Sequence, residues 1–568
     1  MRFFLALTLL ALVACERTPP VAGTDAARAD AARRVDVGAT AANDAGPTND
    51  DASAAVNDAA TAANDDATAG PNDDAAVTPG NDDAAAGPNA DATVAMNPDA
   101  STPAGDAGAP MMGSCAAPSS GSTGAQLFAA IVGCLHLAAE SDMTKRAAID
   151  RFVLAAEAGE GFPIHDGNDL VFVYVRSARW DAEDDNEAAE DFALARRNAP
   201  ITLSGDFNMW ATNGPTLTDE GFDFFDVRIP APAAGTTRSG YKLIARDAMA
   251  GLVYFSDPLS RRFDFDSFGR ISFLRGGDDH GHLERLRSVH AAQLNNDRPI
   301  YVWLPPGYET NAVARFPVLY MHDGNNLFST DLPNVAPAGA WNIQPTLEAE
   351  IFAMRIRAPI VVGIPNNADR FEEYTQVLDD PFGNGGTLVG GDALAYGDFI
   401  VTDLKPQIDA RFRTEPARES TGVIGSSLGG LVSYVIGLAH PGVFKYVGGM
   451  SSTFAWGRFA AMNPTIIEGY QAVMNLPARD QVYYLDTGGG MGGGCMGIFG
   501  GADNYCATAA MRDALIAEGV TTFPDDPNAL TLTPAGINIY HWTEGGAQHT
   551  ESAWAARFFR PLRLFFRR

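Results

Sequence analysis

Residues 16–112 lack almost every residue type from which a protein core is built. The segment contains no Phe, Trp, Tyr, Leu or Ile, and it also has no Lys; Ala, Asp, Asn, Gly, Pro and Thr dominate it. Such a composition cannot bury enough apolar surface to offset the conformational entropy that is lost on ordering. We therefore expect residues 15–113 to form a disordered acidic tether.

The acidic residues of this tether show no pattern of a binding site. Asn-Asp clusters such as Pro71–Asp74 and Gly80–Asp83 lack the regular ligand spacing and the closing glutamate of a calcium-binding hand. The whole chain carries a formal net charge of -30, and much of it lies in this segment. That charge argues against nucleic acid as a partner.

Long apolar runs are also absent, apart from a short one at the N-terminus. Residues 3–13 are apolar except for Thr8, follow Arg2 and lead into Leu12-Val13-Ala14-Cys15. The run is too short to span a bilayer and is typical of a cleaved secretory signal. Its end resembles the lipobox of bacterial lipoproteins, in which the cysteine is lipidated. We expect a lipoprotein signal peptide over residues 1–14 and an extracytoplasmic protein, periplasmic or at the cell surface, anchored to a membrane through Cys15. An ordinary signal peptide with a chance cysteine is the alternative.

Cysteine is scarce, since the chain has only five. Besides Cys15, they form two pairs that are close in sequence, Cys115 with Cys134 and Cys495 with Cys506. In an exported protein such pairs favour disulfides, which we expect here in preference to zinc binding.

About 455 residues follow the tether, enough for two or three domains with their own cores. Residues 123–159 are apolar at helical spacing, so we expect a small helical segment over 114–161. Short strand-like runs with a period of two then follow between Pro, Gly, Asn and Asp, which predicts an all-β sandwich over 162–275. These runs are 170–175, 201–204, 222–227, 241–244 and 253–255.

The sandwich region resembles a known domain type at three short stretches, Gly205–Trp210, Tyr241–Leu243 and Ser256–Pro258. They are similar to the immunoglobulin-like domain shared by glycogen-binding modules and the N-terminal domain of enterochelin esterases. In glycan-binding members a tryptophan stands just before the Asp-Pro, where this chain has Leu252–Phe255. Whether Trp210 packs in the domain or binds a sugar stays open.

After Gly276 the pattern changes to apolar strands that alternate with helices. The strand-like runs are 300–304, 316–321, 360–364, 423–424 and 482–485. Strands of this kind form a mostly parallel sheet that is covered on both faces. Ligands of such sheets bind at the carboxyl ends of the strands. We therefore expect an α/β domain over 276–568.

A serine stands directly after one of these strands, in the pattern Gly425-Ser426-Ser427-Leu428-Gly429. A nucleophilic serine at a sharp strand-to-helix turn needs small residues two positions away on either side, and Gly425 and Gly429 supply them. We therefore predict Ser427 as the nucleophile. Ser426 fills the variable position, so Ser426→Ala is expected to spare most activity.

A serine hydroxyl needs a base, and His549 is the best placed of the nine histidines. It lies in the loop 545–551, between a strand at 537–540 and a C-terminal helix that starts near Ser552. His541 is expected to pack inside that strand. His322 either lines the pocket or makes a structural hydrogen bond.

Two acids compete to orient the base. Asp486 comes directly after the strand at 482–485, whereas Asp503 follows the glycine-rich segment 488–501 and precedes a helix near Ala507. A Cys495–Cys506 bridge would hold the loop of Asp503 still, so we favour Asp503. Capping of the helix is its structural alternative.

The oxyanion of an acyl-transfer intermediate needs two backbone donors. One is the amide of Leu428, after the nucleophile. The other is expected from the loop after residue 321, at Asn325 or Gly324.

These motifs together resemble the putative esterase family of α/β-hydrolases. The resemblance rests on Leu304–Tyr308, Tyr320–Gly324, Arg370 with Glu373-Tyr374-Thr375, Gly425–Gly430, and His549 with Glu551, Trp554 and Arg557. The family includes enterochelin, feruloyl and acetyl-xylan esterases. The resemblance implies the α/β-hydrolase fold, a serine hydrolase of ester bonds with the order Ser427, Asp503, His549, and no metal or organic cofactor. We expect Arg370 and Glu373 to form a buried ion pair that holds their loop.

The leading hypothesis is a carboxylic ester hydrolase that acts on a small-molecule or glycan-linked ester. One alternative is a carbohydrate-binding protein in which the hydrolase fold is a scaffold, and another is an acyltransferase that uses the same triad. The substrate and the oligomeric state are not predicted. The pocket walls depend on the loops 327–343, 379–391 and 454–477, whose conformation the sequence does not give.

Overall fold

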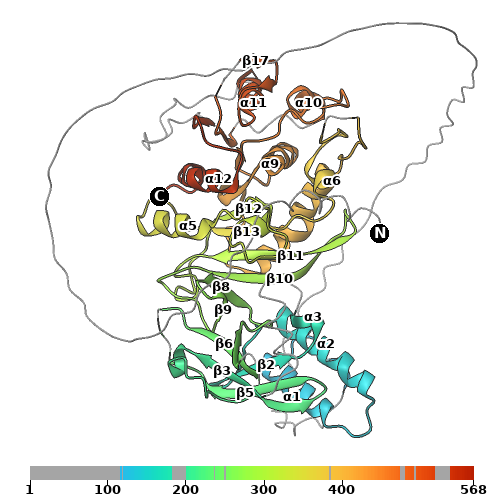
Figure 1. Cartoon of the computed structure of the whole chain (residues 1–568), viewed down its shortest axis with the longest axis vertical. Coiled ribbons are helices and arrows are strands. Elements are labelled where there is room, and N and C mark those ends of the chain that lie inside the picture. Colours follow the sequence, from blue (N-terminus) through green and yellow to red (C-terminus); the bar gives the residue numbers. More distant parts are fainter. Residues whose placement is uncertain are drawn as a thin grey trace, which may run out of the picture. The chain divides into compact units, whose positions relative to one another are not determined.

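The computed structural model describes residues 115–117, 119–181, 200–233, 235, 237–247, 251–382, 385–473, 480–490, 494–517 and 538–568 (Figure 1). The predicted signal peptide, the predicted lipidation site at Cys15 and the predicted tether lie outside these residues. None of the helices within these ranges is both long and apolar enough to cross a membrane.

Two helices, α1 (Gly124–Leu135) and α2 (Asp142–Ala158), begin this part of the chain. The side chain of Thr123 caps the start of α1 and that of Ser141 caps α2, each by accepting a hydrogen bond from a free backbone amide of the first turn. A disulfide joins Cys115 to Cys134 of α1, as predicted, with 4.8 Å between the Cα atoms. The short helix α3 (Ala178–Asp181) follows later.

A four-stranded antiparallel sheet follows the helices, in the strand order β1-β2-β5-β4. Its strands are β1 (Ile164–Asp166), β2 (Asp169–Val175), β4 (Thr218–Gly221) and β5 (Phe224–Pro230). Phe172 of β2 packs edge to face on Tyr241 of a second sheet, with 5.1 Å between the ring centroids. The two sheets therefore share a core. The immunoglobulin-like assignment of this region stays a prediction.

The second sheet runs from this region into the C-terminal half in the order β19-β16-β15-β14-β12-β13-β11-β10-β8-β9-β6-β3, and β7 also pairs with β6. Its antiparallel part consists of β3 (Ile201–Gly205), β6 (Gly240–Asp247), β7 (Gly251–Phe255), β8 (Arg262–Asp266), β9 (Gly269–Phe273), β10 (His282–Ala291) and β11 (Asn296–Leu304). Leu283 of β10 pairs with Phe263 of β8. The sheet thus has no break at the predicted boundary of residues 275 and 276.

Six strands of this sheet are parallel: β12 (Val318–His322), β13 (Ile360–Ile364), β14 (Thr421–Ser426), β15 (Tyr446–Met450), β16 (Val482–Thr487) and β19 (Ile539–Thr543). β11 joins β13 in antiparallel fashion, so the sheet is mixed. Every residue of β12, β13 and β14 is buried, because helices cover both faces of the sheet.

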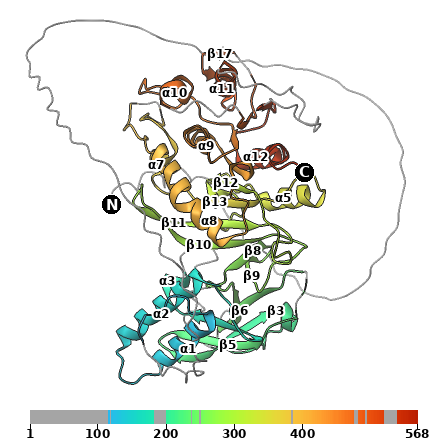
Figure 2. The same cartoon turned by 180° about the vertical axis from the view of Figure 1, so that it is seen from behind.

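The two faces carry separate apolar cores. Val318 and Tyr320 of β12 pack on one face with α9 (Leu428–Ala439), whereas Leu319 and Met321 pack on the other with α5 (Ile343–Phe352), as the period of two in a strand requires. The first core also includes residues of α7 (Ala393–Asp398), α8 (Lys405–Arg411) and α11 (Tyr505–Ala517). The second includes residues of α12 (Glu551–Arg557) and α13 (Phe559–Phe565). Figure 2 shows α7 and α8 in front of the sheet when the protein is seen from behind.

The remaining elements are short and lie mostly in the connections. They are η1 (Asp206–Asn208), η2 (Gly324–Asn326), α6 (Arg370–Tyr374), η3 (Phe399–Leu404), η4 (Arg418–Ser420), α10 (Ile466–Val473), β17 (Cys495–Met496) and β18 (Phe499–Gly500). The carboxyl ends of the parallel strands meet at one edge of the sheet, and the residues that follow them build the candidate site.

Candidate active site

Ser427 occupies the turn between β14 and α9 with φ 55° and ψ -122°. A residue with a side chain rarely adopts a positive φ, and such a conformation persists only where the surroundings fix it. Here the Ser427 amide donates to the carbonyl of Met450 at 2.9 Å, and the Ser427 carbonyl accepts from the amide of Thr453 at 3.0 Å. The end of β15 and the residues that follow it therefore hold the serine in its strained conformation.

The first glycine of the motif is required by the close approach of α9 to β14, and the second lies close to the end of β12. A Cβ atom on Gly425 would lie 2.6 Å from the carbonyl carbon of Gly429. A Cβ atom on Gly429 would lie 3.2 Å from Oδ2 of Asp323 and 3.3 Å from Cβ of His322. The glycines thus let the serine stand at the tip of a tight turn, as the sequence motif suggests.

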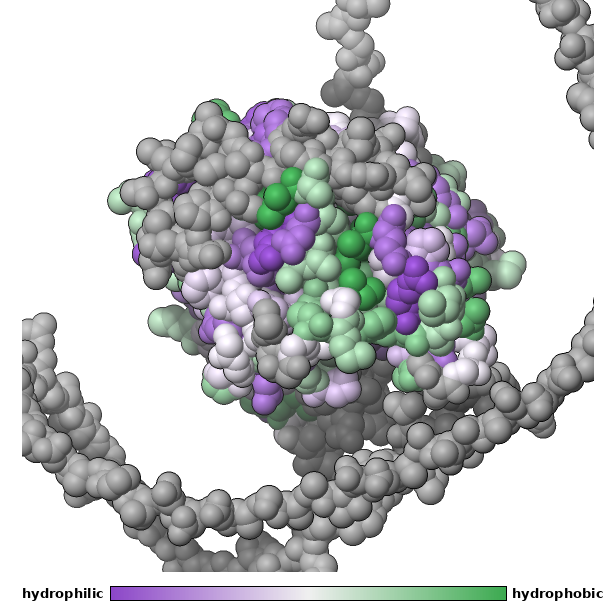
Figure 3. Space-filling model, turned by 90° about the horizontal axis from the view of Figure 1, so that it is seen from above, coloured by the Kyte–Doolittle hydropathy of each residue, from purple (hydrophilic) through white to green (hydrophobic). Residues whose placement is uncertain are grey.

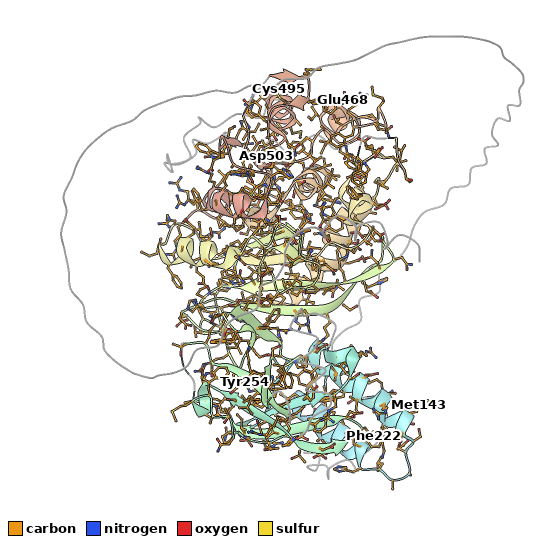
Figure 4. All side chains as sticks on the ribbon, viewed as in Figure 1. Met143, Phe222, Tyr254, Glu468, Cys495 and Asp503 are labelled. Carbon is orange, nitrogen blue, oxygen red and sulfur yellow. A yellow bond between two sulfur atoms is a disulfide. The ribbon has the colours of Figure 1, made fainter. Side chains whose placement is uncertain are left out.

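Of the two acids that the sequence offers, Asp503 contacts the histidine. Nδ1 of His549 lies 2.6 Å from Oδ1 of Asp503, with the histidine side chain 41% exposed and the aspartate 3% exposed. His549 lies on the connection between β19 and α12, and its ring packs edge to face on Trp554. Cys495 forms the predicted disulfide with Cys506. Both Cys495 and Asp503 are labelled in Figure 4.

The second oxygen of Asp503 is held by two other donors. Oδ2 accepts hydrogen bonds from the hydroxyl of Ser451 at 2.6 Å and from the amide of Gly488, and the Thr487 hydroxyl donates to the backbone carbonyl of Asp503. Burial by itself raises the pKa of Asp503, but the hydrogen bonds from His549, Ser451 and Gly488 outweigh it. The pKa of Asp503 therefore lies below its usual value, which keeps the carboxylate ionised next to the imidazole.

Ser451 is a residue of the site that sequence reasoning missed. Its Oγ accepts from Nε1 of Trp554 at 3.0 Å and from a terminal nitrogen of Arg557 at 3.1 Å, and both of these groups can only donate. A hydroxyl has two acceptor positions and one proton, so the proton of Ser451 is left to point at Asp503. Ser451 directly follows β15, a strand that the sequence analysis did not identify.

Asp486, the competing acid, belongs to strand β16 and pairs with Arg557. Its two oxygens accept from the guanidinium at 3.1 Å each, and Oδ2 also accepts from the hydroxyl of Tyr484 at 2.8 Å. Both side chains of the ion pair are fully buried. Burial raises the pKa of Asp486, although Arg557 counters the effect. This pair lies behind the site and supports Ser451.

Ser427, His549 and Asn325 line one cavity of about 360 Å³. Among the described residues no hydrogen bond joins the Ser427 hydroxyl to His549; the Oγ atom lies 3.3 Å from Oγ1 of Thr453. The amide of Leu428 is the first of α9 and therefore has no acceptor within the helix. Asn325 lies in η2, which directly follows β12 and Asp323.

The expected ion pair between Arg370 and Glu373 was wrong, because each residue has another partner. Arg370 donates twice to Asp323, at 2.7 and 2.9 Å, whereas Glu373 accepts from Arg298 at 2.6 and 2.8 Å. The two side chains leave the short helix α6 toward different strands, β12 and β11. Arg370 thus fixes the loop that begins at Asp323.

The other two histidines that the sequence singled out lie in strands. His322 is the last residue of β12, is buried, and has Nδ1 3.1 Å from the hydroxyl of Tyr396. Burial lowers the pKa of His322 to about 3, so the ring is neutral. His541 lies in β19, where Nδ1 is 3.2 Å from a nitrogen of Arg512.

One group of side chains in the described part of the chain has the composition of a metal site. His282, Glu284 and Glu309 bring one ligand atom each within 4.8 Å of one another. However, Arg261 pairs with Glu284 at 2.5 Å and Arg262 pairs with Glu309. Because two guanidinium groups already neutralise the carboxylates, we assign no metal to this group.

Comparison with known proteins agrees with an α/β-hydrolase-like domain that has a mixed sheet. Residues 291–482 match the family model described as "Putative esterase", so this region belongs to that family. Protein YbbA of Bacillus subtilis (strain 168), described as uncharacterized, is 30% identical over 170 residues, which are 29% of this chain and 60% of YbbA. The ferri-bacillibactin esterase BesA of the same strain is 26% identical over 170 residues, 29% of this chain and 57% of BesA.

The matched segment spans about three fifths of the length of these two relatives. Among solved structures, ferric enterobactin esterase from Salmonella typhimurium is 16% identical. The alignment covers 70% of this chain and 93% of that one, with a TM-score of 0.36.

Proposed function

We propose that this protein is a serine hydrolase that cleaves carboxylic esters through an acyl-enzyme. Ser427 is the nucleophile, His549 the general base and then the general acid, and Asp503 the residue that orients the imidazole. The amides of Leu428 and Asn325 stabilise the oxyanion. The observation that carries the proposal is the 2.6 Å contact of His549 with Asp503 at the cavity that Ser427 lines.

The reaction follows from the chemistry of these groups. Nε2 of His549 takes the proton of the Ser427 hydroxyl while Oγ attacks the ester carbonyl carbon. The tetrahedral oxyanion collapses, and the imidazolium gives its proton to the departing alcohol. Water then attacks the acyl-enzyme with the same base, which releases the acid and restores Ser427. Asp503 stays ionised throughout and holds the Nδ1 proton of His549.

Ester bonds are favoured as substrates by the family to which residues 291–482 belong. BesA is by its name an esterase, and it shares 26% of its residues with this chain over the matched segment. The same triad also supports transfer of the acyl group to an alcohol other than water, since only the acceptor differs. Product analysis with and without an added alcohol distinguishes the two reactions.

Two further proposals concern the N-terminal part of the chain. From the sequence of residues 1–15 we propose a membrane-anchored lipoprotein that carries its lipid on Cys15, followed by an extended acidic tether. We also propose an immunoglobulin-like fold for residues 162–275, supported by the core that the four-stranded sheet shares with the antiparallel part of the second sheet. The mass of the mature N-terminal peptide tests the first proposal.

The proposed activity is tested with Ser427→Ala and a short p-nitrophenyl ester. The variant should fold like the wild type, as judged by circular dichroism, and should lose hydrolysis by roughly 10⁴-fold or more. Unchanged turnover in Ser427→Ala would refute the assignment of Ser427 as the nucleophile.

A further inference from the structure

Glu551 is a buried carboxylate that lines the same cavity as Ser427 and His549. It is the first residue of α12, two positions after His549, and only 6% of its surface is exposed. The proposed hydrolysis gives this residue no role. A charged group in such a place normally has a partner, because burying an unpaired charge is costly.

Within the described part of the chain, no ion pair and no hydrogen bond from another residue reaches the Glu551 carboxylate. The Glu551 carboxylate interacts with the backbone amide of the same residue. Three titratable groups interact electrostatically with it, Asp323, His549 and Arg370, and Arg370 already donates twice to Asp323. Asp323 and Arg370 thus compensate each other, which leaves Glu551 as the carboxylate without a cationic partner among the described residues that line the cavity.

The pKa of Glu551 agrees with this arrangement. Burial raises it above the usual value, and the like charge of Asp323 adds to the effect, whereas His549 and Arg370 pull it down. A hydrogen-bond donor placed beside Glu551 would therefore be bound favourably, and a second anion would be repelled.

The position of Glu551 at the start of α12 does not explain its burial. A carboxylate in the first turn stabilises a helix, but the exposed side of the turn gives that benefit without desolvation. Instead, the side chain of Glu551 belongs to the cavity wall. Most of the other lining residues are polar or aromatic, among them Asn326, Asn334, Asn366 and Trp341.

Such a wall suits a polar ester better than a long aliphatic one. On the face seen from above in Figure 3, strongly hydrophilic groups likewise stand directly beside apolar ones. Amide side chains and an unpaired carboxylate offer acceptors for hydroxyl or ammonium protons, while the aromatic rings pack on the carbon skeleton.

We propose that Glu551 is a substrate-binding residue that accepts a hydrogen bond from a hydroxyl or ammonium group of the ester, close to the bond that is cleaved. The substrates are therefore hydroxylated or cationic esters, rather than anionic or purely aliphatic ones. The inference rests on the proposed function, because it takes the molecule bound beside Glu551 to be the ester that Ser427 attacks.

The experiment compares matched esters that differ in one group. Ethyl butyrate, ethyl 3-hydroxybutyrate, ethyl 3-aminobutyrate and monoethyl succinate vary the acyl side, and propyl butyrate with 2-hydroxyethyl butyrate varies the alcohol side. For the wild type we expect kcat/KM to be at least about tenfold higher for the hydroxyl or ammonium ester than for the unsubstituted ester, in either the acyl-side or the alcohol-side series. The kcat/KM of monoethyl succinate should be about tenfold lower than that of ethyl butyrate.

Glu551→Gln keeps the size of the side chain and removes its charge. We expect the preference for the hydroxyl or ammonium ester to fall at least about threefold, and the penalty on succinate to shrink about tenfold. Glu544→Gln is the matched control, because Glu544 lies on the same connection, where its amide donates to Thr487, and does not line the cavity. It should leave both ratios unchanged.

Two results overturn the inference while the esterase assignment stands. Either the wild type hydrolyses all these esters with similar kcat/KM, or Glu551→Gln keeps the full discrimination. If the wild type hydrolyses none of them, the proposed function fails. Saturation-transfer NMR with the same esters then decides the inference: weaker binding of the hydroxylated or cationic esters to Glu551→Gln supports it, and equal binding refutes it.

Discussion

At the residue scale, Asp503 and Asp486 differ in the side chains that they contact, and this difference indicates different roles. Asp503 contacts His549 and is reached by the hydroxyl of Ser451, whereas Asp486 is enclosed with Arg557. Ser451 connects the two sets of side chains, since it donates to Asp503 and accepts from Arg557. A change at either aspartate should therefore affect a different property of the protein.

Asp503→Asn is expected to lower kcat by roughly 10⁴-fold, because an amide leaves the imidazole in the wrong tautomer and does not stabilise imidazolium. The melting temperature should change little. Steady-state hydrolysis of a p-nitrophenyl ester and a thermal melt provide the two values.

Asp486→Asn is expected to act mainly on stability, because it leaves Arg557 buried without its counterion. The free energy of unfolding should fall by about 3–5 kcal/mol. If Asp486→Asn alone abolished activity in a folded protein, Asp486 would be the triad acid and the present assignment would be wrong.

The residues that the sequence predicted are those whose chemistry has a local signature. Ser427 is marked by Gly425 and Gly429, and His549 by its place after a strand. Ser451 had no such signature, because its partners Asp503 and Trp554 lie 52 and 103 positions away in the chain. Arg370 and Glu373 were paired wrongly for the same reason: Asp323 and Arg298 are distant in sequence.

At the element scale, the glycine-rich connection between β16 and α11 carries Asp503, the proposed triad acid. The Cys495–Cys506 bridge joins two cysteines that are 11 positions apart with Asp503 between them, and the Asp503 backbone has φ 52°. Strain of this kind persists only where the surroundings fix it. The bridge is therefore expected to support activity as well as stability.

Replacing both Cys495 and Cys506 by serine should lower kcat, because Asp503 loses its fixed position. The stability loss from the opened loop is about 3 kcal/mol. The control is the double replacement of Cys115 and Cys134, whose disulfide links α1 to the residues before it. This control variant should lose a similar amount of stability and keep the kcat of the wild type. Equal kcat values for both variants would show that the bridge at residue 495 is not needed for the geometry of the acid.

A second element-scale prediction concerns Asp257, which follows β7 and accepts from the hydroxyl of Tyr241 in β6 at 2.7 Å. Burial raises the pKa of Asp257 to about 6, against 3.8 in the unfolded chain, despite the hydrogen bonds from Tyr241 and the amide of Leu259. Between these two values the folded state binds more protons than the unfolded state. Stability should therefore fall as the pH rises from about 4 to 6.

Asp257→Asn removes this titration and keeps an acceptor for Tyr241. The free energy of unfolding, measured in urea at several pH values, should depend less on pH between 4 and 6 in the variant than in the wild type. Parallel curves for the two proteins would contradict the raised pKa.

At the scale of the whole molecule, one sheet joins the N-terminal strands to the site. β8 pairs with β10, and Arg261 before β8 pairs with the buried Glu284 of β10. Arg411 of α8 also donates to the carbonyl of Glu157 in α2 at 3.0 Å. We therefore expect the folding stability of the C-terminal half to depend on residues 114–275.

A chain that begins at residue 276 should be less stable than one that begins at 114, because it exposes the edge of β10 and leaves Glu284 buried without Arg261. The loss is expected to be several kcal/mol, visible as a lower melting temperature or as aggregation. The chain from 114 should keep the kcat/KM of the full protein on a soluble ester. Equal melting temperatures for the two shortened chains would contradict the continuity of the sheet.

The α/β class was predictable because the strands at 316–321, 360–364 and 482–485 are continuous apolar runs, as both-sided burial requires. β10 was not predictable in the same way, since it buries Glu284 and Arg285 among its apolar residues. These charges are tolerated because they have partners from other elements, which hydropathy does not reveal. β15 was missed because glycines interrupt its short apolar run.

The central claim, that Ser427 is an activated nucleophile, is tested most directly by labelling with a fluorophosphonate probe and locating the adduct by peptide mass spectrometry. We predict one adduct, on Ser427, in the wild type and in Ser426→Ala, and none in Ser427→Ala. An unlabelled wild type that is folded, or an adduct on Ser426 or another residue, would contradict the account.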